Sequence, residues 1–145
     1  MSRRPAMDIR PFDTADTEAV VGLWRECNLV VPWNDPYKDI NRKLNVDPEL
    51  FLVGELEGAV VATAMAGYEG HRGWINYLAV APRLQGRGLG RALAERIETL
   101  LRKRGCPKIN LLIRETNQDI IAFYEAMGYV PDESIALGKR LEPDD

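Results

Sequence analysis

Histidine and cysteine are scarce in this chain. His71 is the one histidine among 145 residues, and the two cysteines, Cys27 and Cys106, lie far apart with no Cys-x-x-Cys pair. Zinc sites and disulfide frameworks need several such side chains at characteristic spacings. We therefore expect no metal cofactor and no disulfide, with both thiols free in a reducing compartment.

A long apolar run is also missing. Stretches such as 59–62 fall far short of the ~20 residues that cross a bilayer. Residues 1–4 lead into polar sequence rather than into the apolar stretch of a secretory leader. We therefore expect a cytoplasmic protein.

Positive charge is not in excess. The chain has 22 Asp and Glu against 19 Lys and Arg, which leaves a net charge of −3. Nucleic acids and anionic membrane surfaces attract proteins with a basic field. We expect the protein to bind neither.

The composition that is present is typical of one folded domain. Hydrophobic residues make up 46% of the chain and charged residues 28%, and 145 residues suffice for a single core. We predict one domain over residues 7–142. The acidic end, residues 142–145, is predicted to have no defined structure.

Hydrophobic periodicity and turn residues predict ten helices and strands. The predicted strands are 9–12, 50–55, 59–68, 74–80, 108–114 and 134–141, and the predicted helices are 15–27, 39–45, one that opens at 86–90, and 117–127. This order indicates an α+β fold with a mixed sheet covered on both faces.

The most informative segment joins the strand 74–80 to the helix that opens at 86–90. It reads Val-Ala-Pro-Arg-Leu-Gln-Gly-Arg-Gly-Leu-Gly-Arg over 80–91. Glycines let a backbone approach a ligand closely, and free N–H groups at a helix N-terminus attract anions. Arg83, Arg87 and Arg91 add positive charge at the same place. The segment predicts a phosphate-binding loop, although the glycines would also serve a tight turn alone.

Two well-known phosphate motifs do not match this loop. A dinucleotide fold needs Gly-x-Gly-x-x-Gly, whereas the loop reads Gly-x-Gly-x-Gly followed by Arg91. A P-loop needs Gly-Lys-Ser or Gly-Lys-Thr, and the chain contains neither tripeptide. A nucleotide-binding α/β domain is therefore a distant alternative.

Two motifs resemble the GNAT superfamily of N-acyltransferases. The loop 85–90, Gln-Gly-Arg-Gly-Leu-Gly, resembles the family's Q/R-x-x-G-x-G/A pyrophosphate loop, and Leu-Ala-Val-Ala-Pro at 78–82 resembles the strand before it. Asn117 and the segment 123–129, Phe-Tyr-Glu-Ala-Met-Gly-Tyr, resemble the family's second conserved block. Segments 32–36 and 70–73 further resemble the small bacterial YpeA-type members.

The resemblance implies the GNAT (acyl-CoA N-acyltransferase) fold, a mixed, mostly antiparallel sheet with helices on both faces, and acetyl-CoA as cosubstrate. In the family, the strand before the loop is bulged, splays from its neighbour and pairs with the pantetheine arm. The implied acetyl-CoA contacts are Leu78, Ala79, Val80, Gln85, Gly86, Arg87, Gly88, Leu89, Gly90, Arg91 and Asn117. Tyr124 would be the general acid at the leaving sulfur. A core position for Tyr124 and a helix-capping role for Asn117 stay as alternatives.

The acceptor side is less defined. Trp33 and Asp35 are predicted to line the acceptor pocket, with the carboxylate attracting a cation, although a self-clamped loop is an equal alternative. Glu69, His71 and Asp35 are the candidate general bases. Asn76 and Tyr77 stand where several family members carry a strand glutamate, so the base is unassigned.

The predicted function is N-acetyl transfer from acetyl-CoA to a primary amine of a peptide, protein or small molecule, directly within a ternary complex. Deprotonating a lysine with a pKa of about 10.4 costs roughly 4 kcal/mol near neutral pH, and an α-amine with a pKa of about 8 costs under 1 kcal/mol. The alternative is a CoA-binding regulatory module without catalysis. The sequence leaves the oligomeric state open, a homodimer included.

Overall fold

The computed structural model describes residues 6–144, and the polar start at residues 1–4 lies outside the described residues. The strands form one five-stranded sheet in the order β1-β2-β3-β4-β5. Their bounds are β1 (Asp8–Pro11), β2 (Phe51–Leu56), β3 (Ala59–Tyr68), β4 (Gly73–Val80) and β5 (Ile109–Asn110). β1 to β4 pair antiparallel, and β5 pairs parallel to β4. The mixed, mostly antiparallel sheet is confirmed.

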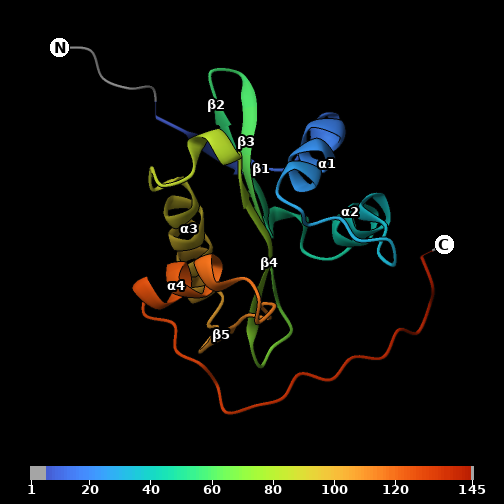
Figure 1. Ribbon diagram of the computed structural model, residues 1–145, viewed down its shortest axis with the longest axis vertical. Helices are drawn as coiled ribbons and strands as arrows, with labels where there is room; N and C mark the ends of the chain where they lie inside the picture. Colours follow the sequence, from blue (N-terminus) through green and yellow to red (C-terminus); the bar gives the residue numbers. More distant parts are fainter. Residues whose placement is uncertain (1–5, 145) are drawn as a thin grey trace.

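Four α-helices cover the two faces of the sheet. They are α1 (Thr17–Glu26), α2 (Pro36–Leu44), α3 (Leu89–Lys103) and α4 (Gln118–Ala126). Figure 1 shows α1 and α2 on one face and α3 and α4 on the other, as the predicted α+β fold requires. Within residues 6–144, no helix has the length and apolar character to cross a membrane.

Side-chain caps place the starts of α1 and α2. Asp35 accepts hydrogen bonds from the amides of Tyr37 and Lys38, so α2 begins at Pro36 rather than at the predicted residue 39. A short 3-10 turn, Thr14–Asp16, forms a capping box with Asp13, and the α-helical part of α1 begins only at Thr17.

The core lies between the sheet and the helices on each face. Trp24 of α1 and Phe51 of β2 are fully buried, and their rings stack with centroids 6.1 Å apart. On the other face, Leu93, Ile97 and Leu101 of α3 are buried along one side of the helix, at the four-residue spacing of an amphipathic helix. The sheet is therefore supported from both faces.

Two of the predicted strands differ in the structure. Only Ile109–Asn110 of the predicted strand 108–114 pairs with β4, because the chain then diverges from the sheet. The prediction of a strand at 134–141 is wrong: this segment is extended but unpaired. A strand needs a partner edge for its N–H and C=O groups, and β5 offers only two residues. Ile135 and Leu137 are about 90% exposed as a result (89% and 93%).

The C-terminal segment instead runs past the lower end of the sheet and ends beside α2 (Figure 1). The Asp144 carboxylate accepts from Arg42 Nη2 at 2.7 Å and from the Asp35 amide at 2.8 Å, and its side chain is 3% exposed. Arg140 lies 3.3 Å from the same carboxylate. The predicted lack of structure at residues 142–145 is therefore wrong at Asp144, and residue 145 is outside the described part.

Asp144→Asn should release this segment from α2. Arg42 and the Asp35 amide lower the pKa of Asp144 to about 2 from its ordinary 3.8. The attachment is therefore complete above roughly pH 4 and is lost as the pH falls through the lowered pKa. Hydrogen exchange and limited proteolysis of residues 130–144 measure the release. Glu142→Gln, which removes a neighbouring exposed carboxylate, should leave the protection unchanged; equal loss in both variants would contradict the role of Asp144.

Candidate functional site

A β-bulge interrupts β4 in the middle of the sheet. Thr63 of β3 pairs with Ala79, but Met65 pairs with Asn76, so two residues of β4 stand opposite one residue of β3. Tyr77, in the bulge, has a φ of 52°, which is rare for a residue with a side chain. The bulge re-aims the Tyr77 side chain away from the regular alternation of the strand.

A buried hydrogen-bond chain holds the bulge in place. The Thr63 hydroxyl donates to the Tyr77 carbonyl at 2.8 Å, and the Trp24 indole N–H donates to the Thr63 hydroxyl at 2.9 Å. The Trp24 ring also stacks on the Tyr77 ring with centroids 3.8 Å apart. Because Thr63 and Trp24 are fully buried, the strained backbone is supported from the core.

One edge of β4 is open from Ile75 onward, through the bulge and to the end of the strand. Pairing with β5 involves only Gly73 and Trp74, so Ile75 to Val80 have no strand partner on that side among the described residues. This is the splay that the resemblance implies. The edge exposes backbone groups to which an extended ligand can add as a further strand.

The glycine-rich loop follows the open edge. Gly86 and Gly88 both have a φ of +80°, and a Cβ at either position would meet no atom within 4 Å. Gly88 is the N-cap of α3 and provides no side chain to cap it, so the first amides of the helix keep their N–H groups for another partner. The loop combines open space, free donors and the positive end of a 15-residue helix.

Gly90 has a different role from the two loop glycines. It is buried, and a Cβ there would lie 3.4 Å from Val80 Cγ2 and 3.5 Å from Phe123 Cζ. The end of β4, the start of α3 and helix α4 therefore meet at this glycine. Its small size brings Phe123 and its neighbour Tyr124 close to the loop.

The polar side chains of the loop divide into two groups. Gln85 donates to the Val80 carbonyl at 3.0 Å and ties the loop to the end of β4. Arg91 pairs with Glu95 one turn along α3, at 2.8 Å. Arg83 and Arg87 are exposed and form no ion pair with the described residues. These two arginines are the ones available to an incoming anion.

Tyr124 is 4% exposed on α4. Its ring makes edge contacts with Phe123 and Tyr129, at centroid distances of 5.0 and 5.2 Å. Burial raises the pKa of the phenol, and its hydroxyl makes no hydrogen bond to another residue within 6–144. The hydroxyl is thus a protonated donor without a protein partner.

Asn117, exposed at the start of α4, accepts from the Ile120 amide as the N-cap, so the capping alternative is confirmed.

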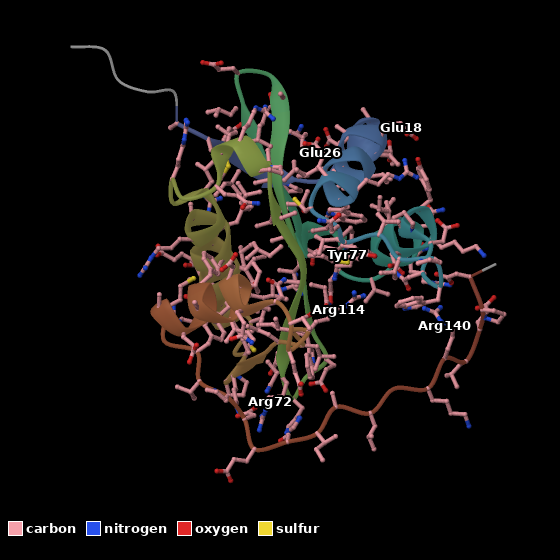
Figure 2. All side chains as sticks on the ribbon, viewed as in Figure 1. Glu18, Glu26, Arg72, Tyr77, Arg114 and Arg140 are labelled. Carbon is pink, nitrogen blue, oxygen red and sulfur yellow. The ribbon has the colours of Figure 1, made fainter. Side chains whose placement is uncertain are left out.

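On the α1–α2 side of the sheet, β4 borders an open depression of about 790 Å³. Its lining residues come from the loop after α1, from α2 and the loop that follows it, from β3 and β4, and from the chain after β5; they are Leu29, Val31, Trp33, Asn34, Asp39, Arg42, Lys43, Val46, Met65, Asn76, Tyr77, Leu112 and Arg114. In Figure 2, Tyr77 and Arg114 lie on the side of β4 that faces α2. The volume suits a small ligand.

The bulge residue Tyr77 organises one wall of the depression. Its hydroxyl donates to Asp39 at 2.6 Å, and Asn34 Nδ2 donates to the Tyr77 oxygen at 3.0 Å. Asn34 also bonds Asp39, and Arg42 lies 3.3 Å from the same carboxylate. Asp39 is therefore held by three donors. Burial, and next the hydrogen bond to Asp39, raise the pKa of Tyr77, so it stays a neutral phenol.

Residues 17–129 match the family model described as the acetyltransferase (GNAT) family. The chain belongs to this GNAT family. An acetyltransferase of Yersinia enterocolitica is 53% identical over 135 residues, which cover 93% of this chain and 96% of that one. An acetyltransferase of Pectobacterium atrosepticum is 52% identical over 138 residues, covering 95% and 98%. The family inferred from the two sequence motifs is confirmed, and the protein is an N-acetyltransferase of a family whose acetyl donor is acetyl-CoA.

Solved structures share the fold of this GNAT chain. The ribosomal-protein-S18-alanine N-acetyltransferase of Escherichia coli is 26% identical with a TM-score of 0.71, over 85% of this chain and 77% of that one. An aminoglycoside N-acetyltransferase in complex with CoA has a TM-score of 0.76 over 97% and 99%, at 17% identity. The second likeness concerns the fold alone.

The predicted acceptor residues of this GNAT chain separate in the structure. Trp33 lines the depression and is 62% exposed. Asp35 caps helix α2, and Glu69 accepts from the amides of His71 and Arg72 in the β3–β4 turn. Both carboxylates are therefore bonded to nearby backbone amides, and neither lines the depression. The amides of Arg72 and His71 lower the pKa of Glu69. Substrate contact by Asp35 or Glu69 stays a prediction.

Sequence reasoning missed four polar residues of the depression: Asp39, Arg42, Lys43 and Arg114. Three of them stand on one short helix, and their spacing alone is typical of a solvated helix face. Arg114 falls at the end of the predicted strand 108–114. No local signal distinguishes these side chains from surface charges.

Proposed function

We propose that this GNAT chain transfers an acetyl group from acetyl-CoA directly to a primary amine of a peptide, protein or small molecule, with both substrates bound together. The observation that carries the proposal is the open edge of β4. This edge begins beside Asn76 and Tyr77, which line the depression, and ends at Val80, whose carbonyl accepts a hydrogen bond from Gln85 of the glycine-rich loop. One strand edge thus connects a place for a pyrophosphate with a place for an acceptor.

The residues on the loop side fit acetyl-CoA. The pyrophosphate would take the free amides that follow Gly86 and Gly88, with Arg87 at its side. The pantetheine arm would pair with the backbone of Leu78 to Val80. Asn117 keeps a free amide group for the same arm while its oxygen caps α4.

The chemistry requires a neutral amine and a protonated leaving group. The amine lone pair attacks the thioester carbonyl carbon, the C–N bond forms, and the C–S bond breaks. We assign to Tyr124 the proton that the sulfur takes up; solvent takes the proton that nitrogen loses and returns one to the Tyr124 phenolate, so that the phenol is restored for the next turnover. An α-amine near its own pKa needs no strong base for this step.

A panel of amines with acetyl-CoA, followed by release of free thiol, tests the proposal. We expect thiol release with at least one class of primary amine and a stoichiometric acetylated product by mass spectrometry. Acetyl-CoA binding without turnover of any amine would favour the regulatory module instead. A cytoplasmic location remains a prediction from the sequence.

The protein should bind CoA at least tenfold more tightly than NAD or ATP. The loop suits any pyrophosphate, but only CoA has a pantetheine arm to pair with the open edge of β4. Calorimetric titration with the three ligands measures the preference. Equal or tighter binding of NAD would contradict the proposed acetyl-CoA site.

A further inference from the structure

The depression beside Tyr77 is positively charged. Three cationic side chains line it, Arg42, Lys43 and Arg114, against one carboxylate, Asp39. The sequence predicts negative charge on the acceptor side, from the carboxylate of Asp35. In the structure this carboxylate instead accepts hydrogen bonds from the first amides of α2. The balance of charge in the depression therefore favours an anionic ligand group.

Part of this positive charge is neutralised by ion pairs within the protein. Asp39 is held by Tyr77, Asn34 and Arg42, and Arg42 also binds Asp144 at 2.7 Å. Arg42 and Asp39 thus balance within the protein.

Arg114 and Lys43 form no ion pair with any residue of the described chain. The Arg114 guanidinium lies 5.9 Å over the Trp33 ring. A guanidinium that stacks on a ring keeps its in-plane N–H groups free for a bidentate anion. The Lys43 ammonium lies over the sheet, 3.7 Å from where a Cβ of Gly67 would be.

The rim of the depression already binds a carboxylate. The Asp144 side chain sits between Arg42, Arg140 and the Asp35 amide, and only 3% of it is exposed. Arg140 also donates to Asn34, which lines the depression, and Figure 2 shows it on the C-terminal segment. This face of the molecule thus supplies the geometry that carboxylates require.

We propose that the acceptor is a small molecule that carries a carboxylate near its primary amine, as an amino acid does, and that Arg114 and Lys43 bind this carboxylate. The inference rests on the proposed acetyl transfer to an amine. Cations near the reacting nitrogen also disfavour its ammonium form. The same charges that hold the carboxylate therefore help to supply the neutral amine, in a site where no lining carboxylate is free to act as a base.

Free amino acids and their carboxamides are a matched pair of acceptors for the test. Each pair shares the side chain and the amine and differs in the carboxylate. The amine of the carboxamide is less basic, so the chemistry alone favours the amide and biases the test against the proposal. With acetyl-CoA saturating, we expect kcat/KM of the preferred amino acid to exceed that of its amide at least tenfold. Equal or better turnover of the amides, or of amines on a whole protein, would overturn the proposal.

Arg114→Gln should lower kcat/KM for the amino acid about 10- to 100-fold and change that for the amide less than about threefold, because only the acid loses a charge-assisted hydrogen bond. Lys43→Gln should act in the same direction. Arg96→Gln, which removes an exposed charge from α3 outside the depression, is the control. Equal losses for acid and amide would show that Arg114 is structural. An amine that carries a phosphate in place of the carboxylate is a further acceptor in the test. A higher kcat/KM for this amine than for the amino acid would overturn the assignment of the anion as a carboxylate.

A binding experiment separates this inference from the proposed function. If no amine is acetylated, the proposed transfer fails, and the amino acids are titrated by calorimetry into the protein saturated with CoA. Binding to the wild type that is lost in Arg114→Gln supports the anion site independently of turnover. Absent binding, or equal binding to both proteins, overturns it.

Discussion

Tyr124→Phe should lower the rate of acetyl transfer by about 10²-fold or somewhat less and leave acetyl-CoA affinity nearly unchanged. General acid catalysis contributes roughly 10²–10⁴-fold, and a thiolate is a fair leaving group, which places the loss at the low end. The ring keeps its edge contacts with Phe123 and Tyr129. The hydroxyl bonds no other described residue, so its removal breaks no internal hydrogen bond and the fold should be as stable as before.

Tyr129→Phe is the matched control. Tyr129 packs against Tyr124, and its hydroxyl donates to Glu98 at 2.8 Å. Its replacement loses a structural hydrogen bond and should leave the rate unchanged. Single-turnover measurements with a confirmed acceptor show whether chemistry limits the rate. If Tyr124→Phe then reacts as fast as the wild type, Tyr124 is a core aromatic and not the acid.

The pH dependence gives a second readout for Tyr124. Burial raises the pKa of the phenol above its ordinary 10.0, so the group keeps its proton at all pH values near neutrality. The ratio of wild-type to Tyr124→Phe rates should therefore stay constant between about pH 6 and about pH 9. A ratio that falls toward one within this range would mean that the phenol ionises there, against the effect of its burial.

Gly88→Gln should weaken acetyl-CoA binding roughly 10²- to 10⁴-fold. The residue has a φ of +80° and open space around it, so a side chain would enter the volume that we assign to the pyrophosphate. Losing about two charge-assisted hydrogen bonds accounts for this range of affinity. The fold should lose only roughly 1–2 kcal/mol, the cost of a left-handed backbone for a residue with a Cβ.

Gly58→Gln is the control that separates the loss of stability caused by a left-handed backbone from the loss of acetyl-CoA affinity. Gly58, in the β2–β3 turn, has a φ of +81° and likewise no atom within 4 Å of a built Cβ. Both variants should lose similar thermal stability, but only Gly88→Gln should lose affinity in calorimetric titration. If the folded fraction of Gly88→Gln binds acetyl-CoA normally, Gly88 is a turn residue and the loop does not hold the pyrophosphate.

The features that could be predicted from the sequence are those that depend on residues close to one another along the chain. The periodicity of α3 predicted its buried face at Leu93 and Ile97, and the glycines at 86 and 88 predicted a loop that opens this helix. The family followed from two short motifs for the same reason. Errors of a few residues, as at the start of α2, arose where a side-chain cap such as Asp35 outweighed the apolar pattern.

The course of the chain after α4 could not be read in this way. Residues 134–141 alternate as a strand does, but a strand forms only beside a partner edge, and β5 is two residues long. The path is set instead by Asp144, whose contacts with Arg42 and the Asp35 amide join residues about a hundred positions apart. Such pairings depend on where the rest of the chain has folded.

The acceptor side depends on tertiary structure for the same physical reason. Arg114 meets Trp33, and Tyr77 meets Asp39 and Asn34, across separations that no local pattern spans. The bulge that turns Tyr77 toward α2 is held by Thr63 and Trp24, two buried residues from other elements. The sequence therefore determined the glycine-rich loop, most of the order of elements and the family, whereas the charge and the shape of the depression beside Tyr77 arose only when distant segments packed together.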